Sequence, residues 1–258
     1  MRLGVPLVVL FALLALFGPW LAPYDPRAID LAHAYAAPSA AHWLGTGDNG
    51  VDMLSVLLHG ARLAGVVGLL VVGFTATLGT VVGALAGYAG GRVDHALSGL
   101  ADLLQAFPGL ILNVAILALV DAPGVRHVVL ALCIPGWVLY ARIARAEALR
   151  LRDAEFVQAA VALGATPSRV LLRHVVPNLL GPIVVQATTA FGGVVLAEST
   201  LSFLGLGPSD GVSWGALLDQ GSAVLLRFPH VALVSGAAIA ATVLGFNLAG
   251  DAARDRWG

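Results

Sequence analysis

The chain contains no lysine, and charged residues of every kind are scarce. Its 14 basic residues are therefore all arginine, and Asp, Glu, Lys and Arg together make up 11% of the 258 residues. A soluble domain carries roughly 25% charged residues. A P-loop needs a lysine on the phosphates, so this chain lacks that means of holding ATP. Any ATP-driven process would need a motor on another polypeptide.

Cysteine and paired histidines are also nearly missing. The one cysteine, Cys133, lies inside an apolar run, which excludes a disulfide framework. Three of the seven histidines, His33, His42 and His59, share one segment, but their spacing resembles no zinc-ligand set. The formal net charge of -1 gives no electrostatic argument for nucleic acid. We therefore expect neither a metal nor a cofactor on this chain, and no nucleic-acid partner.

Apolar residues, in contrast, are abundant. They make up 59% of the chain, and the mean hydropathy is +0.89. A spanning helix needs about 20 mostly apolar residues. Six segments meet this requirement: 4–22, 63–89, 97–120, 126–147, 180–206 and 228–249. The sequence thus predicts an all-α integral membrane protein with about six transmembrane helices.

The first apolar segment has an alternative interpretation as a signal peptide, because Arg2 supplies a minimal positive start. Its apolar run exceeds the roughly 7–15 residues of such a leader. The following FGPWLAPYDP also offers no A-x-A cleavage site. We expect a retained helix.

The distribution of arginines predicts the orientation in the membrane. With the N-terminus inside, 10 arginines fall on the cytoplasmic side or at its boundary. Only four fall outside: Arg27, Arg62, Arg126 and Arg227. This asymmetry predicts that both termini are cytoplasmic, together with the loop 148–178.

The chain divides by pattern into residues 1–62, a first helix with an outer loop that ends in a short helix, and residues 63–258, a five-helix core. In the second span, Gly79, Gly83 and Gly87 recur every four residues, which favours close helix packing within the bundle over a dedicated dimer face. Pro108 and Pro135 fall inside the third and fourth spans, and each should kink its helix.

The segment EFVQAAVALGATPSRVLLRHVVPN (155–178) interrupts this apolar pattern. Asp153 can cap a helix, and Glu155 lies in its first turn, where the helix dipole favours negative charge. Phe156, Ala160 and Leu163 then share one face. Gly164 suits the left-handed position that ends a helix.

A second helix is predicted directly afterwards. Thr166 is an N-cap residue, and Pro167 fits the first helical position. This helix should run to about Val176, where Pro177 interrupts it. The helix-turn-helix is typical either of an amphipathic linker resting on the bilayer surface or of a helix that docks into a partner's groove. Periodicity and caps leave both open.

The same residues carry a resemblance. Gln158-Ala159-Ala160, Gly164 and Val176-Pro177-Asn178 resemble the cytoplasmic "EAA" loop of permease subunits from binding-protein-dependent ABC importers, with Gln in place of Glu and Val in place of Leu. Segments 42–62, 78–94, 106–110 and 198–218 resemble the dipeptide, oligopeptide and nickel branch. Where that branch commonly has Gly-Arg-Asp, this chain has Gly50-Val51-Asp52, which puts the family's packing of the outer loop in doubt.

The resemblance implies a role for the loop. Residues 155–164 would form a coupling helix that docks on a cytoplasmic ATPase, with Glu155, Phe156, Gln158, Ala159, Ala160, Leu163, Gly164 and Pro177 at the contact. It further implies a bacterial or archaeal inner (plasma) membrane location and a peptide-like cargo, with nickel as the alternative. The implied partners are a homologous permease, two ATPase subunits that hold ATP and Mg, and an extracytoplasmic solute-binding protein.

Other functions fit parts of the chain less well. Gly211-Val212-Ser213-Trp214-Gly215 matches the G-x-S-x-G of serine hydrolases, with Asp219 and His230 following, but no strand is predicted before it. An ion-coupled transporter would show repeats and charges at mid-bilayer, and no repeat is visible. The polar residues within spans are interior hydrogen-bond partners or line a translocation path: Asp102, Gln105, Asn113 and Glu198.

Overall fold

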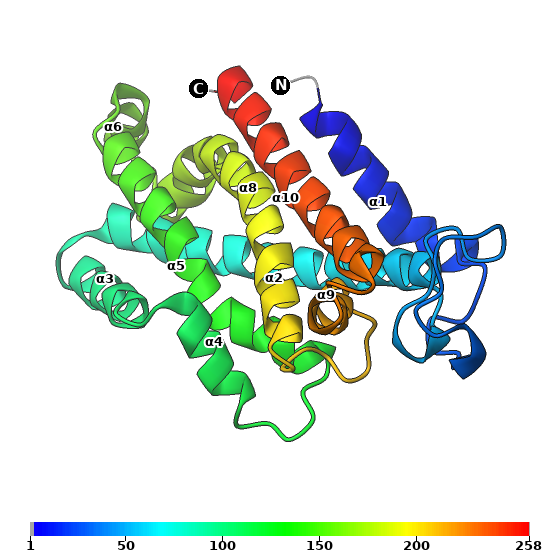
Figure 1. The fold of residues 1–258 in the computed structure, drawn as a ribbon. Helices are drawn as coiled ribbons and strands as arrows, with labels where there is room; N and C mark the ends of the chain where they lie inside the picture. The colour runs from blue at the N-terminus through cyan, green and yellow to red at the C-terminus, as the bar shows by residue number, and fades with distance from the viewer. Residues whose placement is uncertain (1–2, 258) are drawn as a thin grey trace.

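The computed structural model describes residues 3–257, and they form a bundle of helices without a β-strand (Figure 1). The longer helices are α1 (Gly4–Leu21), α2 (Met53–Ala89), α3 (Gly91–Gln105), α4 (Gly109–Leu117), α5 (Val125–Arg152), α8 (Val176–Phe203), α9 (Trp214–Ala223) and α10 (Pro229–Trp257). The short ones are η1 (Leu31–His33), η2 (Asp48–Gly50), α6 (Glu155–Ala162), α7 (Pro167–Val170) and the π-helical turn η3 (Leu171–Val175). Five helices are long and apolar enough to cross a membrane, and α3 with α4 can supply a sixth, broken span.

Helix α2 is longer than the predicted second span. It starts at Met53 because Asp52 caps it: the Asp52 carboxylate accepts a hydrogen bond from the Ser55 backbone N–H at 2.8 Å. The expected short outer helix is therefore the first part of α2, and a boundary at residue 62 falls inside this helix. Its 37 residues extend roughly 55 Å at 1.5 Å per residue, well beyond a bilayer core of about 30 Å.

The glycine stripe of α2 packs against α5. A side-chain carbon added at Gly79, Gly83 or Gly87 would collide with the backbone of α5, at the carbonyls of Trp137, Ala141 and Arg145 respectively. Close contact of this kind holds helices together in lipid, where no hydrophobic force draws them to each other. The prediction of packing within the bundle is confirmed.

The third predicted span is not one kinked helix. It is broken at Pro108, and α3 and α4 meet at an angle of 76°. Proline lacks the N–H that would continue α3, so Pro108 instead precedes the first turn of α4. Pro135, in contrast, lies inside α5, which continues without a break. Residues 97–120 were predicted as one span with a kink at Pro108; the structure instead has two separate helices there.

The expected end of the second cytoplasmic helix near Val176 was also wrong. Pro167–Phe203 forms one helical path, in which the π-helical turn η3 precedes Pro177. Pro177 falls in the first turn of α8, where its missing N–H is tolerated. The π-helical turn, which is wider than an α-helical turn, lets the helical path continue through the proline.

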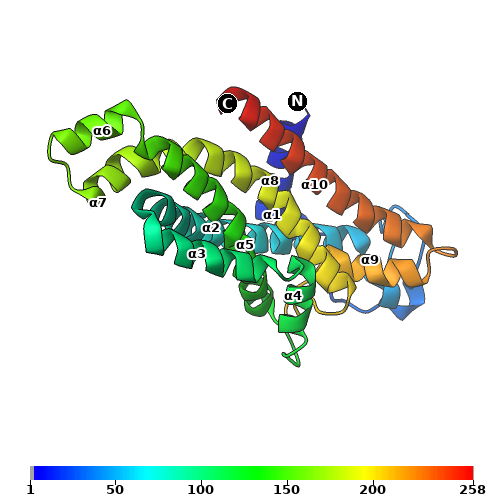
Figure 2. The ribbon, with the colours of Figure 1, turned by 90° about the vertical axis from the view of Figure 1, so that its left-hand side faces the viewer.

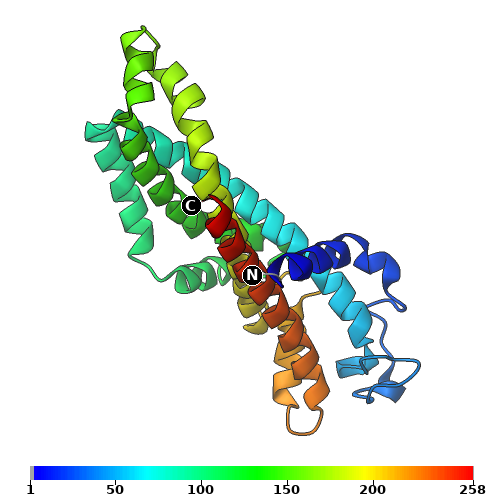
Figure 3. The same ribbon diagram turned by 90° about the horizontal axis from the view of Figure 1, so that it is seen from above.

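The two ends of the bundle differ. Helices α6 and α7 project beyond the other helices at one end (Figure 2), and the two termini lie close together (Figure 1). Seen from above, α2 runs diagonally across the molecule (Figure 3). The arginine distribution predicts that the α6–α7 end is cytoplasmic.

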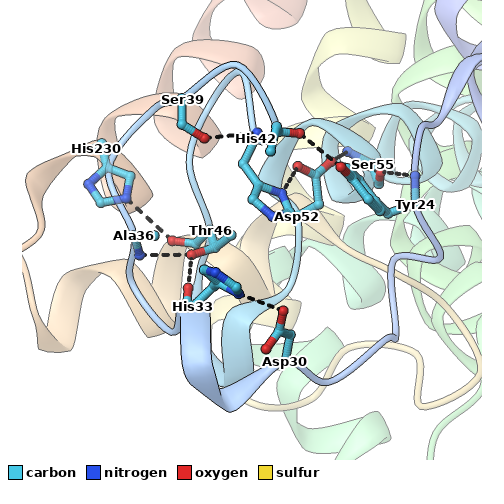
Figure 4. Close-up of polar contacts among 11 residues, drawn as sticks. Tyr24, Asp30, His33, Ala36, Ser39, His42, Thr46, Asp52, Ser55 and His230 are labelled. Carbon is cyan, nitrogen blue, oxygen red and sulfur yellow. Dashed lines mark hydrogen bonds and ion pairs between the residues drawn. The ribbon is translucent and has the colours of Figure 1, made fainter.

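The outer segment between α1 and α2 is held by polar contacts (Figure 4). His42 Nδ1 lies 2.9 Å from the buried Asp52 carboxylate, and Thr46 bonds to the Ala36 N–H and the His33 carbonyl. The exposed His33 lies beside Asp30 at 2.7 Å, and this hydrogen bond lowers the pKa of the Asp30 carboxyl. These contacts order a segment that has almost no helix of its own.

The packing of α2 on α5 gives a first test. Gly83→Ala should destabilise the protein, because the added methyl meets the Ala141 backbone, and overpacking costs roughly 1–3 kcal/mol. Gly73→Ala is the matched control, since Gly73 lies on the same helix with nothing within 4 Å. Thermal unfolding in detergent should show a lower Tm for Gly83→Ala only. An equal response of both variants would contradict this packing.

Candidate functional site

The turn at the cytoplasmic end is built by local sequence. α6 begins after Ala154, and no side chain caps it. The predicted cap at Asp153 was wrong: Asp153 ends α5, and its backbone carbonyl accepts a hydrogen bond from Gln158 Nε2 at 3.2 Å. Gly164 ends α6 with φ of +84°, as predicted, and this left-handed conformation suits a residue without a side chain.

The second helix of the turn starts as expected. Thr166 Oγ1 accepts a hydrogen bond from the Arg169 backbone N–H at 3.4 Å, and Pro167 is the first helical residue. Ala165 N–H also reaches back to the Ala160 carbonyl at 3.0 Å, which closes the end of α6. The turn between α6 and α7 is thus fixed by its own caps.

Two valines attach this helix pair to the bundle. Val157 of α6 and Val170 of α7 are both buried, and they pack in one cluster with Ala148 and Leu151 of α5 and with Leu179 of α8. Val157 was not predicted from the sequence, although it falls on a different face of α6 from Phe156. Because α6 is anchored on α5, a displacement of α6 would be passed to a membrane-spanning helix.

The opposite face of α6 is exposed and apolar. Leu163 is 89% exposed, and Phe156 is 46% exposed. Beside it lies an open groove of about 610 Å³, lined by Ala160, Leu163, Gly164, Ala165, Arg169, Arg173 and His174. Glu155, Gln158 and Ala159 are exposed on the same short helix, whereas Pro177 lies in the first turn of α8. The groove combines apolar side chains with two arginines.

The candidate path residues lie in different environments. Asp102 and Gln105 are exposed near the end of α3, and Asp102 forms an ion pair with Arg142 of α5 at 2.8 Å. Asn113 of α4 is buried, and its Oδ1 has no hydrogen-bond partner among residues 3–257. Glu198 is 2% exposed and accepts a hydrogen bond from Ser202 at 2.7 Å, which makes it a packing residue of α8 in this conformation.

An ion pair that the sequence analysis missed holds α3 on α5. Arg145 Nη2 lies 2.6 Å from one carboxylate oxygen of Asp94, and its Nε bonds to the other oxygen. Bidentate arginine–carboxylate pairs of this kind are stronger than hydrogen bonds between neutral groups. Asp94 and Arg145 both lie near the cytoplasmic ends of their helices, a position that could have indicated the pair.

The motif resembling a serine hydrolase does not form a catalytic site. Ser213 is buried and caps α9, with its Oγ accepting from the Gly215 N–H at 3.0 Å. His230 Nε2 instead lies 3.3 Å from the Thr46 carbonyl. Within residues 3–257, no hydrogen bond joins Ser213 to His230 or Asp219, and no group of three or more His, Cys, Asp or Glu could hold a metal ion.

Comparison with known families agrees with this arrangement. The family model described as "Binding-protein-dependent transport system inner membrane component" matches residues 79–256. The chain belongs to this family of ABC importer permeases. Residues 2–38, which include α1, match a separate model, the N-terminal transmembrane domain of oligopeptide transport permease C. The chain is therefore a multi-pass inner-membrane protein.

Curated relatives share this assignment over nearly the full chain. A probable D,D-dipeptide transport system permease protein from Escherichia coli is 38% identical over 96% of this chain and 84% of its own. The dipeptide permease of Alkalihalophilus pseudofirmus is 36% identical, with 98% and 83% covered. A glutathione transport permease from Shigella dysenteriae is 38% identical, with 96% and 82% covered.

A solved structure shows the same fold. A chain of the inward-facing MetNI methionine ABC transporter superposes with a TM-score of 0.64 at 19% identity, covering 79% of this chain and 97% of that one. The expected fold class, an all-α membrane protein of about six spans, is confirmed.

The sidedness of the turn can be measured directly. In a Cys133→Ala background, Leu163→Cys should react with a membrane-impermeant maleimide only in inside-out vesicles, because Leu163 is 89% exposed at the cytoplasmic end. Leu226, in the loop before α10, is also fully exposed. Leu226→Cys should therefore react only from the outer face, in cells whose inner membrane is intact and whose outer membrane has been permeabilised. Reaction of Leu163→Cys from the outside would contradict the orientation.

Proposed function

We propose that this chain forms half of the translocation path of an ABC importer for peptides, and that α6 couples the path to a separate ATPase. The observation that carries the proposal is the turn of α6 and α7. One face of α6 is anchored on α5 and α8 through Val157, and the other face presents Leu163 and Phe156 to the outside of the bundle.

Docking is favoured over a linker resting on the bilayer. An interfacial helix lies in the membrane plane with its apolar face in lipid, whereas α6 and α7 extend past the end of the bundle (Figure 2). Leaving Leu163 in water forgoes roughly 1.5–3 kcal/mol relative to its burial. A partner's groove that buries this side chain would recover that free energy and give α6 a defined position.

Arg169 and Arg173 define the kind of partner surface. They line the groove beside Ala160 and Leu163, so a partner that fills it would supply an apolar ridge flanked by acidic groups. The partners we propose are a homologous permease, two ATPase subunits that bind ATP and Mg, and an extracytoplasmic solute-binding protein. The chain itself then performs no covalent chemistry.

The peptide cargo is inferred from relatives rather than from a pocket. The similar proteins are named as permeases for D,D-dipeptides, dipeptides and glutathione. Asp102 and Gln105, which are exposed at the end of α3 that leads into α4, are our candidates for the surface that a peptide passes. Asn113 and Glu198, which are buried, would take part only if their helices move. Within residues 3–257, no group of His, Cys, Asp or Glu favours nickel as the cargo.

Substitutions in the turn test the coupling. With the complete transporter in proteoliposomes, Ala160→Arg and Gly164→Pro should reduce ATP-dependent dipeptide uptake at least tenfold while the protein remains inserted. Ala160→Arg fills the groove with a charge, and Gly164→Pro is incompatible with φ of +84°.

Gly164→Asn is the matched control, because asparagine tolerates the left-handed conformation. It should retain most of the uptake. Wild-type uptake by both Ala160→Arg and Gly164→Pro would refute docking through α6. Uphill uptake by the purified chain without any other protein would instead indicate an ion-coupled transporter.

A further inference from the structure

An apolar groove follows α1 on the side of the bundle. Its volume is about 660 Å³, within the roughly 300–1,000 Å³ of typical ligand pockets. Helices α1, α2, α8 and α10 all contribute to it, chiefly through Phe11, Ala15, Leu69, Val72, Ala187 and Phe191. Arg62 is the one charged residue in its lining.

The floor of the groove is rigid. Phe191 stacks on Phe246 with ring centroids 4.3 Å apart, and Phe11 meets Phe191 edge to face at 5.9 Å. Gly68 of α2 makes this possible, because a side chain there would collide with the Phe191 ring. Because packed aromatic rings form its floor, this groove exists without a bound ligand.

Arg62 also lines a second hollow of about 480 Å³, so it lies where the groove and this hollow meet. The same hollow contains the acidic groups Asp25 and Asp210. Each accepts a backbone hydrogen bond at 2.9 Å, from the Arg27 N–H and the Val125 N–H respectively, and neither carboxylate lies within 4 Å of the Arg62 guanidinium. Within residues 3–257, the Arg62 guanidinium has neither an ion pair nor a hydrogen bond. The charge is exposed and available to an anion.

The length of the groove along α1 is close to the thickness of the hydrocarbon layer of one membrane leaflet. It follows α1 from Val8 to Trp20, a distance of roughly 18 Å at 1.5 Å per residue. Half of the bilayer core is about 15 Å. Trp20 is 72% exposed at the Arg62 end, and tryptophan at this depth is typical of the membrane–water interface.

We propose that this groove binds an anionic phospholipid of the outer leaflet, with one acyl chain along Phe11 and Phe191 and the phosphate on Arg62. The charge complementarity selects the occupant: an unpaired arginine at the interface, above an apolar channel, fits a lipid whose phosphate is not balanced by a cationic headgroup and therefore carries a net negative charge. The lipid would fasten α1 to the transport core.

The position of α1 argues against a protein helix as the occupant. α1 also exposes apolar side chains that do not line the groove, among them Val9, Leu10 and Leu13, as expected of a peripheral helix in contact with lipid. It also belongs to the segment 2–38, outside the match to residues 79–256. The groove is therefore formed where an added helix meets the core, and it opens toward the bilayer.

Photo-crosslinking tests the site in the assembled transporter. The complex is reconstituted in phosphatidylethanolamine vesicles with a trace of phosphatidylglycerol that carries a photoreactive acyl chain, and adducts are mapped by mass spectrometry. Adducts should concentrate on residues 8–20 and 65–72. Arg62→Leu should reduce them roughly fivefold, the effect of one interfacial arginine on an anionic lipid.

Three variants sharpen the result. Arg62→Lys should retain the adducts because it keeps the charge, and Ala12→Trp should remove them by filling the groove without touching Arg62. Arg126→Leu, which removes another exposed outer arginine, should have no effect. A photoreactive phosphatidylcholine should show no dependence on Arg62.

Two outcomes would overturn the proposal. Equal adducts in wild type and Arg62→Leu would mean that only unselective boundary lipid touches α1. Adducts that form on the isolated chain but disappear in the assembled complex would mean that a helix of the partner permease occupies the groove.

Discussion

The close approach of α2 and α5 is the contact on which the rest of the structure depends. Three glycines spaced four residues apart bring the two backbones together, so that Gly83 lies directly against the Ala141 carbonyl. α5 in turn carries the arginines that hold α3, and its cytoplasmic end supplies the cluster on which Val157 of α6 rests. A rigid pair of helices thus connects the exposed turn with the middle of the bundle.

This arrangement explains how a chain without a P-loop can take part in ATP-driven transport. An importer must have two states that differ in free energy of contact with its motor. In the coupling that we propose, the exposed face of α6 offers this contact, and its buried face passes displacement to α5 and α8. The broken helix at Pro108 adds a second feature: α4 is joined to α3 by a bend of 76°, so these two segments do not form one continuous helix.

Much of this architecture was predictable because a helix that crosses lipid must consist of about 20 mostly apolar residues. The spans followed from apolar length, and the caps at Gly164, Thr166 and Pro167 followed from local conformational preference. Prolines were harder. Pro108 precedes the first turn of α4 and breaks a span, Pro135 lies inside α5 without breaking it, and Pro177 falls in the first turn of α8 after a π-helical turn. Proline alone does not distinguish these three outcomes in the sequence. The predicted cap at Asp153 failed because α5 extends that far.

The most direct test of the coupling is to identify the partner that Leu163 contacts by photo-crosslinking. A photoreactive amino acid placed at this position in the complete transporter should form an adduct with the P-loop subunit, and ATP should change its yield. Attachment to lipid or to the solute-binding protein, with no adduct on the ATPase in any nucleotide state, would contradict the account.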